Sequence, residues 1–334
     1  MDWSIYLIRR YSNFLSKVSE SRALYSQIEA SSQYARHCVA GVLYQELEHI
    51  GDASANAFRA AWQEDVVKRQ DTDVGSEEIA RWGLQDVLEA CEHPEPQIGR
   101  LPCGSWVLRF RFTLASSYIS RDDKPAHIID NPVSRDHVFG LPMIRPSSWK
   151  GNLRATCRLM TDRGSNDPQV LRMFGSPREG GDDLSAGRLV FFPTFFRRTG
   201  LEIINPHDRA TKTGRNPILI ECVPPGAQGS FSLLYVPLDR IGDEPTRVVE
   251  EALADLRRIA GALPAMMLTY GFSAKRSSGY GTAKDDVQNG QILMSLRRGT
   301  RRQRLQTRFE RLTALPRICE RVATRLEGKE HRNG

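Results

Sequence analysis

Residues 127–154 read HIIDNPVSRDHVFGLPMIRPSSWKGNLR, and this stretch predicts a loop that leads into a helix. The loop is expected because Asn131 precedes Pro132, and a residue before a proline disfavours helical backbone. The helix is expected to begin at the serines, where Ser147 or Ser148 is predicted to act as the N-cap.

Positive charge follows the predicted helix start. Lys150, Arg154 and Arg158 recur at a spacing that places them along the first turns of the helix. Free backbone N–H groups, hydroxyl groups and cations then converge on one place. This combination is typical of a phosphate-binding site.

A second stretch, GFSAKRSSGYG at residues 271–281, predicts a glycine-rich loop. Gly279 and Gly281 would let backbone amides approach an anion, while Lys275 and Arg276 supply positive charge. An ordinary hairpin loop rich in glycine and serine is the other interpretation, and this short motif alone does not separate the two. Two basic sites together favour RNA or DNA over a metabolite, because a long polyanion needs several phosphate contacts.

Charge is unevenly distributed along the 334 residues, whose net charge is +7. Residues 1–98 carry 9 Lys and Arg against 16 Asp and Glu, which gives −7 and leaves +14 for residues 99–334. The last 38 residues, 297–334, carry 12 against 4, or +8. The first part is therefore expected to repel polyanions and the rest to attract them.

The hydrophobic pattern changes from helical to alternating along the chain. Residues 3–92 show helical spacing, with a break at 51–53, and residues 106–114 alternate as in a half-buried strand. Strands are predicted at 187–192, 218–223, 231–236 and after residue 281, and a helix at 246–263 that ends at Pro264. Leu305, Phe309 and Leu312 indicate some helical order near the end. This order predicts an α+β, ferredoxin-like fold at 99–296, between an acidic helical module (1–98) and a basic tail (297–334).

Several classes of protein find no support in the sequence. No apolar run approaches the roughly 18 residues of a membrane span, so a cytoplasmic protein without membrane contact is expected. Six cysteines without a C-x-x-C pair predict buried thiols rather than zinc ligands or disulfides. The chain has no nucleotide-binding P-loop motif.

At these motifs the chain resembles the RAMP (repeat-associated mysterious protein) superfamily of CRISPR effector complexes, in particular the repeating backbone subunit of type III complexes. The resemblance rests on IDNPV at 129–133, GLPMI at 140–144 and SSWKGNLR at 147–154. Shorter matches follow in the expected order at 174–175, 187–189, 208–209, 221–224 and 271–281, so residues 99–296 are covered. The chain departs from the family at residues 116–120, where members often have a His-Gly-rich passage, and at Trp149, which replaces a leucine.

The resemblance implies a modified RNA-recognition-motif core, in subunits that stack along a guide RNA with other effector subunits and copies of themselves. It implies that an arm near residues 208–215 inserts between guide and target RNA. It also assigns guide-phosphate binding to Ser147, Ser148, Lys150 and Arg154, with further contacts from Lys275, Arg276, Gly279 and Gly281.

The resemblance further implies that Asp130 cuts target RNA with a divalent metal ion, Mg or Mn, which Asp130 would bind. This role is chemically reasonable, because the 2′-hydroxyl of RNA is its own nucleophile and needs only in-line geometry and a carboxylate. Residues 130–132 also fit an ordinary turn, so a non-catalytic structural RNA-binding subunit is the main alternative. A stand-alone guide-processing ribonuclease that uses a histidine such as His127 is a third hypothesis.

Overall fold

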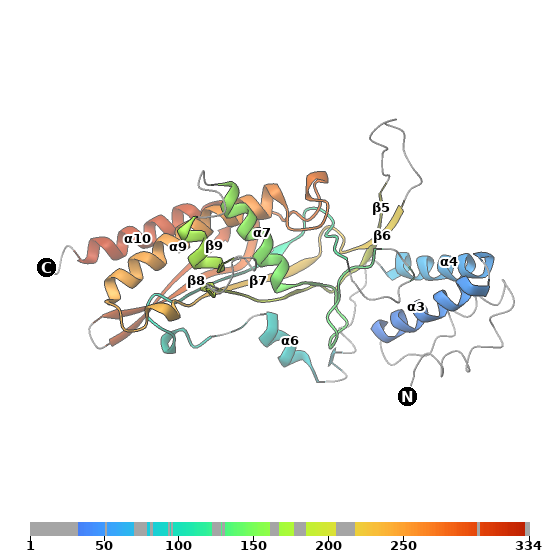
Figure 1. Ribbon diagram of the computed structural model, residues 1–334, viewed down its shortest axis with the longest axis horizontal. Coiled ribbons are helices and arrows are strands. Elements are labelled where there is room, and N and C mark those ends of the chain that lie inside the picture. Colours follow the sequence, from blue (N-terminus) through green and yellow to red (C-terminus); the bar gives the residue numbers. More distant parts are fainter. Residues whose placement is uncertain are drawn as a thin grey trace. The chain divides into compact units, whose positions relative to one another are not determined.

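A computed structural model describes residues 33–50, 52–69, 79–80, 83–92, 94, 96–121, 128, 131–160, 167–176, 185–204, 218–298 and 301–330 (Figure 1). The chain forms two compact units, each assembled from segments far apart in sequence. The first unit contains residues 1–85, 117–143 and 196–227, and the second contains 86–116, 144–195 and 228–334. This grouping differs from the predicted boundaries after residues 98 and 296, because packing partners rather than charge decide which segments belong together.

The second unit is built on a five-stranded antiparallel sheet with the spatial order β3-β7-β1-β8-β9. Its strands are β1 (Trp106–Thr113), β3 (Leu189–Phe191), β7 (Gln228–Tyr235), β8 (Asp286–Arg298) and β9 (Arg301–Arg311). Helix α7 (Pro146–Leu159) follows β1, and α9 (Pro245–Ala265) follows β7. This is the βαββαβ order of a ferredoxin-like fold, to which β9 adds an edge strand. The predicted α+β fold class is confirmed.

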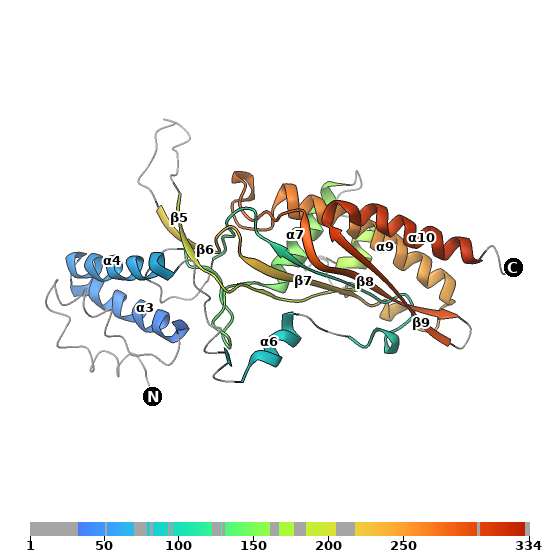
Figure 2. The same cartoon turned by 180° about the vertical axis from the view of Figure 1, so that it is seen from behind.

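Helices α7, α9 and α10 (Leu315–Glu330) lie on one face of this sheet (Figures 1 and 2). The alternation in β1 has the predicted effect, because Trp106, Leu108, Phe110 and Phe112 are all buried. The aromatic rings among these side chains pack against aromatic partners from other elements; Phe112, for example, lies 6.1 Å from Trp149 of α7 in an edge-to-face pair. Such geometry adds stability beyond the buried area.

Helix α9 is longer than predicted. It begins after Glu244, whose carboxylate accepts hydrogen bonds from the N–H groups of Thr246 and Arg247. The prediction that Pro264 ends the helix is wrong, since the helix passes through it into a π-helical turn, η5 (Met266–Tyr270). A proline removes one backbone hydrogen bond, and a wider turn is one way to accommodate its ring. Met266 and Met267 are fully buried there, which stabilises the continuation.

The residues after 300 form a strand and not the helical segment predicted from Leu305, Phe309 and Leu312. Strand β9 pairs with β8 from Arg301 opposite Arg298 to Arg311 opposite Asp286. Leu305 and Phe309 are four residues apart, a spacing that puts two side chains on one side of either a helix or a strand. Leu312 follows in a short helical turn, η7 (Leu312–Ala314).

A network of charged side chains joins α9 to the sheet. The Arg188 guanidinium is 5% exposed, donates to Asp239 Oδ1 (2.7 Å) and to the Tyr235 hydroxyl (2.8 Å), and forms an ion pair with Glu251. The Tyr235 hydroxyl in turn donates to Asp255 (2.8 Å), which is fully buried. Asp255 also forms an ion pair with Arg172, so each buried charge in this network has an opposite partner, as burial requires.

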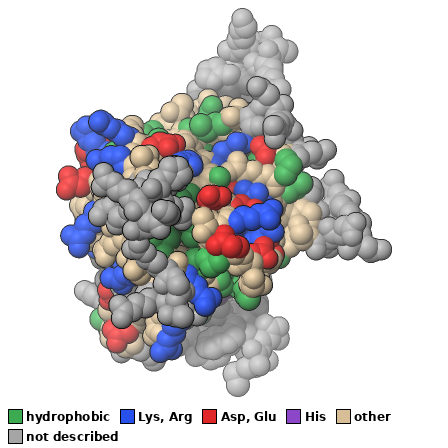
Figure 3. Space-filling view, turned by 90° about the vertical axis from the view of Figure 1, so that its left-hand side faces the viewer, with side chains coloured by type: hydrophobic (Ala, Val, Ile, Leu, Met, Phe, Trp, Pro, Cys, Tyr) green, Lys and Arg blue, Asp and Glu red, His purple; other side chains and the backbone are tan. Residues whose placement is uncertain are grey.

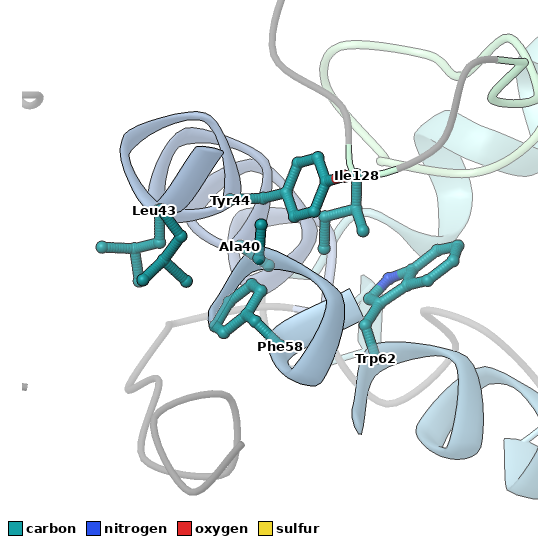
Figure 4. Close-up of a cluster of buried hydrophobic side chains, with 8 residues drawn as sticks. Ala40, Leu43, Tyr44, Phe58, Trp62 and Ile128 are labelled. Atoms are coloured by element: carbon teal, nitrogen blue, oxygen red, sulfur yellow. The ribbon is translucent and has the colours of Figure 1, made fainter. Parts of the chain in front are cut away.

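In its described residues, the first unit contains two helices and a pair of strands. Helices α3 (Gln33–Ile50) and α4 (Asp52–Arg69) pack together, and the break predicted at residues 51–53 separates them. Strands β5 (Gly200–Ile204) and β6 (Ile218–Cys222) form an antiparallel pair. The core of this unit combines Phe58 and Trp62 of α4 with Ala40, Leu43 and Tyr44 of α3 and with Ile128 from a loop (Figure 4). Leu201 and Leu219 of the strands pack against it.

The described residues also form several shorter elements. They are α6 (Gln85–Glu92), η2 (Ile98–Arg100), β2 (Met143–Ile144), α8 (Pro168–Phe174), β4 (Thr194–Phe195), η4 (Leu238–Arg240) and η6 (Arg276–Ser278). No helix among the described residues is long and apolar enough to cross a membrane.

The cysteine side chains follow the prediction in part. Cys157, Cys222 and Cys319 are buried, whereas Cys91 and Cys103 are partly exposed. Burial raises the pKa of Cys157, Cys222 and Cys319 to about 12. These three thiols are therefore protonated and unreactive at neutral pH.

Candidate nucleic-acid interface

The helix α7 begins one residue earlier than predicted. Arg145 is the N-cap, with extended backbone and no side-chain hydrogen bond, and Pro146 occupies the first helical position. The fixed φ of proline suits this position, so the prediction that Ser147 or Ser148 caps the helix is wrong. The N–H groups of Ser148 and Trp149 donate to the Arg145 carbonyl (2.9 and 3.2 Å), so the first turn offers fewer free N–H groups than predicted.

The side chains of this first turn differ in their surroundings. Ser147 is exposed and Ser148 and Lys150 are half-buried, so the two hydroxyl groups lie at or near the surface. Trp149 is fully buried, and its indole Nε1–H donates to Thr194 Oγ1 (3.0 Å). The residue that replaces the family leucine therefore belongs to the hydrophobic core and not to the surface that would meet RNA.

Arg154 contributes to the fold as well as to the charge of this surface. Its Nη2 donates to the Gly175 carbonyl (2.9 Å), and desolvation followed by the nearby Arg158 charge lowers its pKa. Gly175 has φ +84°, and a Cβ there would come within 2.7 Å of the Ser185 carbonyl oxygen. Arg154 thus fixes a turn that only glycine can form, so its guanidinium is only partly available to a ligand.

The glycine-rich loop has a tight base and an open tip. At the base, a Cβ on Gly281 (φ +70°) would lie 2.2 Å from Cβ of Ser273, so glycine is required. At the tip, residues 274–279 are exposed, Lys275 has left-handed backbone (φ 55°), and a Cβ on Gly279 would meet no atom within 4 Å. The cations Lys275 and Arg276 are therefore displayed on the exposed part of a loop whose ends are fixed.

One side chain joins α7 to this loop. The Asn152 amide nitrogen donates both to the Ser148 carbonyl (2.9 Å) and to the Phe272 carbonyl (3.1 Å). The ring of Phe272 also lies 4.8 Å from that of Trp149. The first turns of α7 and the glycine-rich loop are thereby held side by side, as the hypothesis of one phosphate-binding surface requires.

The predicted catalytic residue Asp130 is outside the described residues, as are His127 and the predicted arm at 208–215. Among the described residues, no group of three or more His, Cys, Asp and Glu side chains could hold a metal ion. The structure therefore gives no observation on the predicted roles of Asp130 in catalysis and in metal binding.

The residues that flank Asp130 in sequence are firmly attached within the first unit. Ile128 is buried in the core of α3 and α4, and the Asn131 carbonyl accepts a hydrogen bond from the N–H of Glu221 in β6 (3.2 Å). The Glu221 carboxylate accepts from the N–H of Val133 (2.9 Å) and forms a buried ion pair with Arg135. The segments on both sides of Asp130 thus have fixed attachment points.

A model of the RAMP superfamily matches residues 49–284 of this chain. The chain belongs to the RAMP superfamily. The match begins earlier and ends earlier than the predicted 99–296, so α4 lies inside the RAMP region whereas β8, β9 and α10 lie outside it.

Two curated proteins and one solved structure show what this RAMP protein is similar to. Over 154 residues the chain is 29% identical to the CRISPR system Cms endoribonuclease Csm3 of Enterococcus italicus. The aligned residues cover 40% of this chain and 67% of that protein. Over 171 residues it is 29% identical to the protein of the same name from Streptococcus thermophilus, and this alignment covers 46% of this chain and 73% of that protein. A chain in the cryo-EM structure of the type III-B Cmr-beta complex bound to cognate target RNA is 16% identical to this chain, with a TM-score of 0.47. The structural match covers 88% of this chain and 99% of that chain.

Three residues that shape these sites were not predicted from the sequence. Asn152 lies inside the SSWKGNLR motif, four residues after Ser148. This spacing could have predicted its hydrogen bond to the Ser148 carbonyl one helical turn earlier. Arg135 and Glu221 lie 86 residues apart, and nothing in either local sequence indicates that they form a pair.

Proposed function

We propose that this chain is the guide-RNA-binding backbone subunit of a type III-like CRISPR effector complex and that it cleaves target RNA complementary to the guide. The attachment of the glycine-rich loop to α7 through Asn152 carries the proposal, because it presents Ser147, Lys275 and Arg276 from one connected substructure. Membership of the RAMP superfamily and the similarity to two proteins named endoribonuclease support it. The partners are then guide RNA, target RNA, other effector subunits and further copies of this chain.

Cleavage is assigned to Asp130. The 2′-hydroxyl of the target attacks the adjacent phosphorus and loses its proton to a base. The bond to the 5′-oxygen breaks, this oxygen takes up a proton from water to become a hydroxyl, and a 2′,3′-cyclic phosphate results. The Asp130 carboxylate assists removal of the proton or holds a divalent ion, Mg or Mn. The buried Arg135–Glu221 pair and the core residue Ile128 support this role by fixing the segments that flank Asp130.

The test is cleavage of a guide-complementary RNA by the assembled complex, with Asp130→Ala and His127→Ala compared. Glu250→Ala is the control, because it removes an exposed carboxylate from α9. We expect Asp130→Ala to abolish cleavage with guide binding unchanged, and EDTA to stop the reaction until Mg or Mn is restored. A deoxyribose at the cleaved position should also block it.

Other outcomes separate the remaining hypotheses. Cleavage that survives Asp130→Ala contradicts the assignment, and loss in His127→Ala alone favours a histidine-dependent guide-processing ribonuclease. Guide binding without any cleavage by the parent complex indicates a purely structural subunit.

A further inference from the structure

The sheet face opposite α7, α9 and α10 carries a pocket of about 650 Å³. Its floor is apolar, because Val107 of β1 and Leu293 of β8 pack there with Ile98 of the segment that crosses this face. Its polar side chains are of two kinds, guanidinium and amide, and include Arg100, Arg109, Arg304, Gln291, Gln303 and Gln306.

The strand register explains why these side chains share one face. Gln291 stands opposite Arg109 on one side and Arg308 on the other, and Leu293 stands opposite Gln306. Residues directly opposite each other in a sheet point to the same face. Gln306 and Arg308 of β9 therefore line the same face as the pocket floor, together with Arg304, two residues further along.

Charge around the pocket is distributed unequally. None of the described lining residues is acidic, and Arg100, Arg304 and Arg308 are exposed. The acidic residues Asp86, Glu89 and Glu92 belong instead to α6, and the Ser232 hydroxyl of β7 donates to the Glu92 backbone carbonyl at the end of that helix (3.2 Å). On the side of the molecule shown in Figure 3, by contrast, Lys and Arg side chains lie beside Asp and Glu side chains, so charges of both signs are mixed there. A polyanion is therefore attracted to the β8 and β9 side of this face and repelled from the α6 side.

We propose that this pocket binds single-stranded RNA, with one nucleotide in the pocket and the flanking phosphates along β9. Amide groups donate and accept hydrogen bonds, so glutamines fit the edge of a base, and an apolar floor with guanidinium planes fits its flat face. Exposed arginines fit phosphates. An acidic peptide needs the cations alone, so the glutamines favour RNA. This surface is additional to the guide-binding surface of α7 and the glycine-rich loop, and β8 and β9 lie outside the RAMP match.

The test measures binding of a fluorescein-labelled ten-nucleotide oligouridine to the full chain. All variants are made in a Lys275→Gln/Arg276→Gln background, which weakens the contribution of the proposed guide surface equally in each of them. Arg100→Gln/Arg304→Gln is the variant, and Arg247→Gln/Arg321→Gln, which removes two exposed arginines from α9 and α10, is the matched control. We expect the variant to bind about 10-fold more weakly and to flatten the log–log salt slope by about 1.4, or about 0.7 per lost phosphate contact. The control should match the background.

Two probes separate RNA from other anions. An abasic ribose-phosphate oligomer of equal length should bind more weakly than oligouridine, and poly-L-glutamate should compete poorly. Crosslinks from 4-thiouridine should map to residues 94–109 or 286–308. Equal affinity of variant and control overturns the proposal, as does poly-L-glutamate that competes as well as RNA, which would indicate an acidic protein partner. The proposed function is tested by other measurements, namely guide binding through Lys275 and Arg276 and target cleavage through Asp130, so its failure is distinguishable from failure of this proposal.

Discussion

Two groups of cations in the second unit differ in what surrounds them. Arg172 and Arg188 are hydrogen bonded to carboxylates of α9 or its neighbours, and Arg188 is almost completely buried. Lys275 and Arg276 lie on an exposed loop, where no hydrogen bond from either side chain is found among the described residues. Arg154 is intermediate, since it is half-buried and bonded to a backbone carbonyl. The surroundings of a cation, rather than its place in a motif, decide whether it stabilises the fold or is available to a ligand.

The largest expected effect comes from removing a cation of the first group. Arg188→Met removes the ion-pair partner that Glu251 and Asp239 share, and it removes the N–H donor from which the Tyr235 hydroxyl oxygen accepts a hydrogen bond. We expect a loss of about 2–3 kcal/mol in the free energy of unfolding, because Arg188 is buried but Asp239 is more than half exposed and Glu251 keeps its ion pair with Arg240. Urea unfolding followed by circular dichroism measures it.

The matched control for this change is Arg247→Met, which removes an exposed arginine from the first turn of the same helix. Its cost should stay within about 0.5 kcal/mol, as for most surface substitutions. Equal losses in the two variants would show that the network around Arg188 adds no stability.

The second expected effect compares two glycines of the loop that displays Lys275 and Arg276. Gly281→Ala places a Cβ 2.2 Å from Cβ of Ser273 in left-handed backbone, so the base of the loop must shift. Gly279→Ala meets no atom within 4 Å and has only the strain of its φ of +82°, about 1 kcal/mol. We expect Gly281→Ala to lower both the unfolding free energy and the affinity for RNA clearly more than Gly279→Ala does. Similar results for both would mean that the base of the loop is not rigid.

Sequence patterns predicted the elements well where one spacing fits one structure. The alternation at residues 106–114 fits only a strand, and the ferredoxin-like order followed from it and its neighbours. Leu305 and Phe309, four residues apart, fit two structures, and the sequence could not decide between them. Pro264 shows a different limit, because burial of Met266 and Met267 keeps the chain helical beyond a residue that normally ends a helix.

The candidate site was predictable to the extent that its residues are close in sequence. Ser147, Lys150 and Arg154 belong to one helix, and the glycine-rich loop is a single segment. Their attachment through Asn152 and Phe272 spans 120 residues, and the Arg135–Glu221 pair spans 86. Contacts over such distances depend on the fold as a whole, so no local pattern could indicate them.

A smaller effect is expected from acid. Burial alone would raise the pKa values of Asp239 and Glu251, but hydrogen bonds from Arg188, with further help from Arg240, lower both. A carboxylate with a lowered pKa stabilises the folded state fully above its unfolded value, near 4, and this stability is lost as the pH falls through the folded value. We expect the unfolding free energy of the parent to fall more steeply below about pH 4 than that of Arg188→Met. Urea unfolding at pH 7, 5, 4 and 3 measures both. Parallel curves would contradict the assignment of these shifts to Arg188.

The smallest effect concerns the cations of the second group and appears in salt dependence rather than in stability. If Lys275 and Arg276 contact guide phosphates, a variant with glutamine at either position releases one fewer counterion from the RNA when it binds. The log–log slope of affinity against salt should then flatten by about 0.7 to 0.9 per residue, for every RNA sequence alike. The unfolding free energy should not change, because both side chains are exposed.

Arg154→Gln should flatten the slope and also lower stability, since it removes the hydrogen bond to Gly175. Fluorescence anisotropy at four salt concentrations measures the slopes, with Arg247→Gln as the control. A slope that flattens in Arg154→Gln but not in the loop variants would place the bound phosphates on α7 alone, and the glycine-rich loop would then be an ordinary hairpin turn.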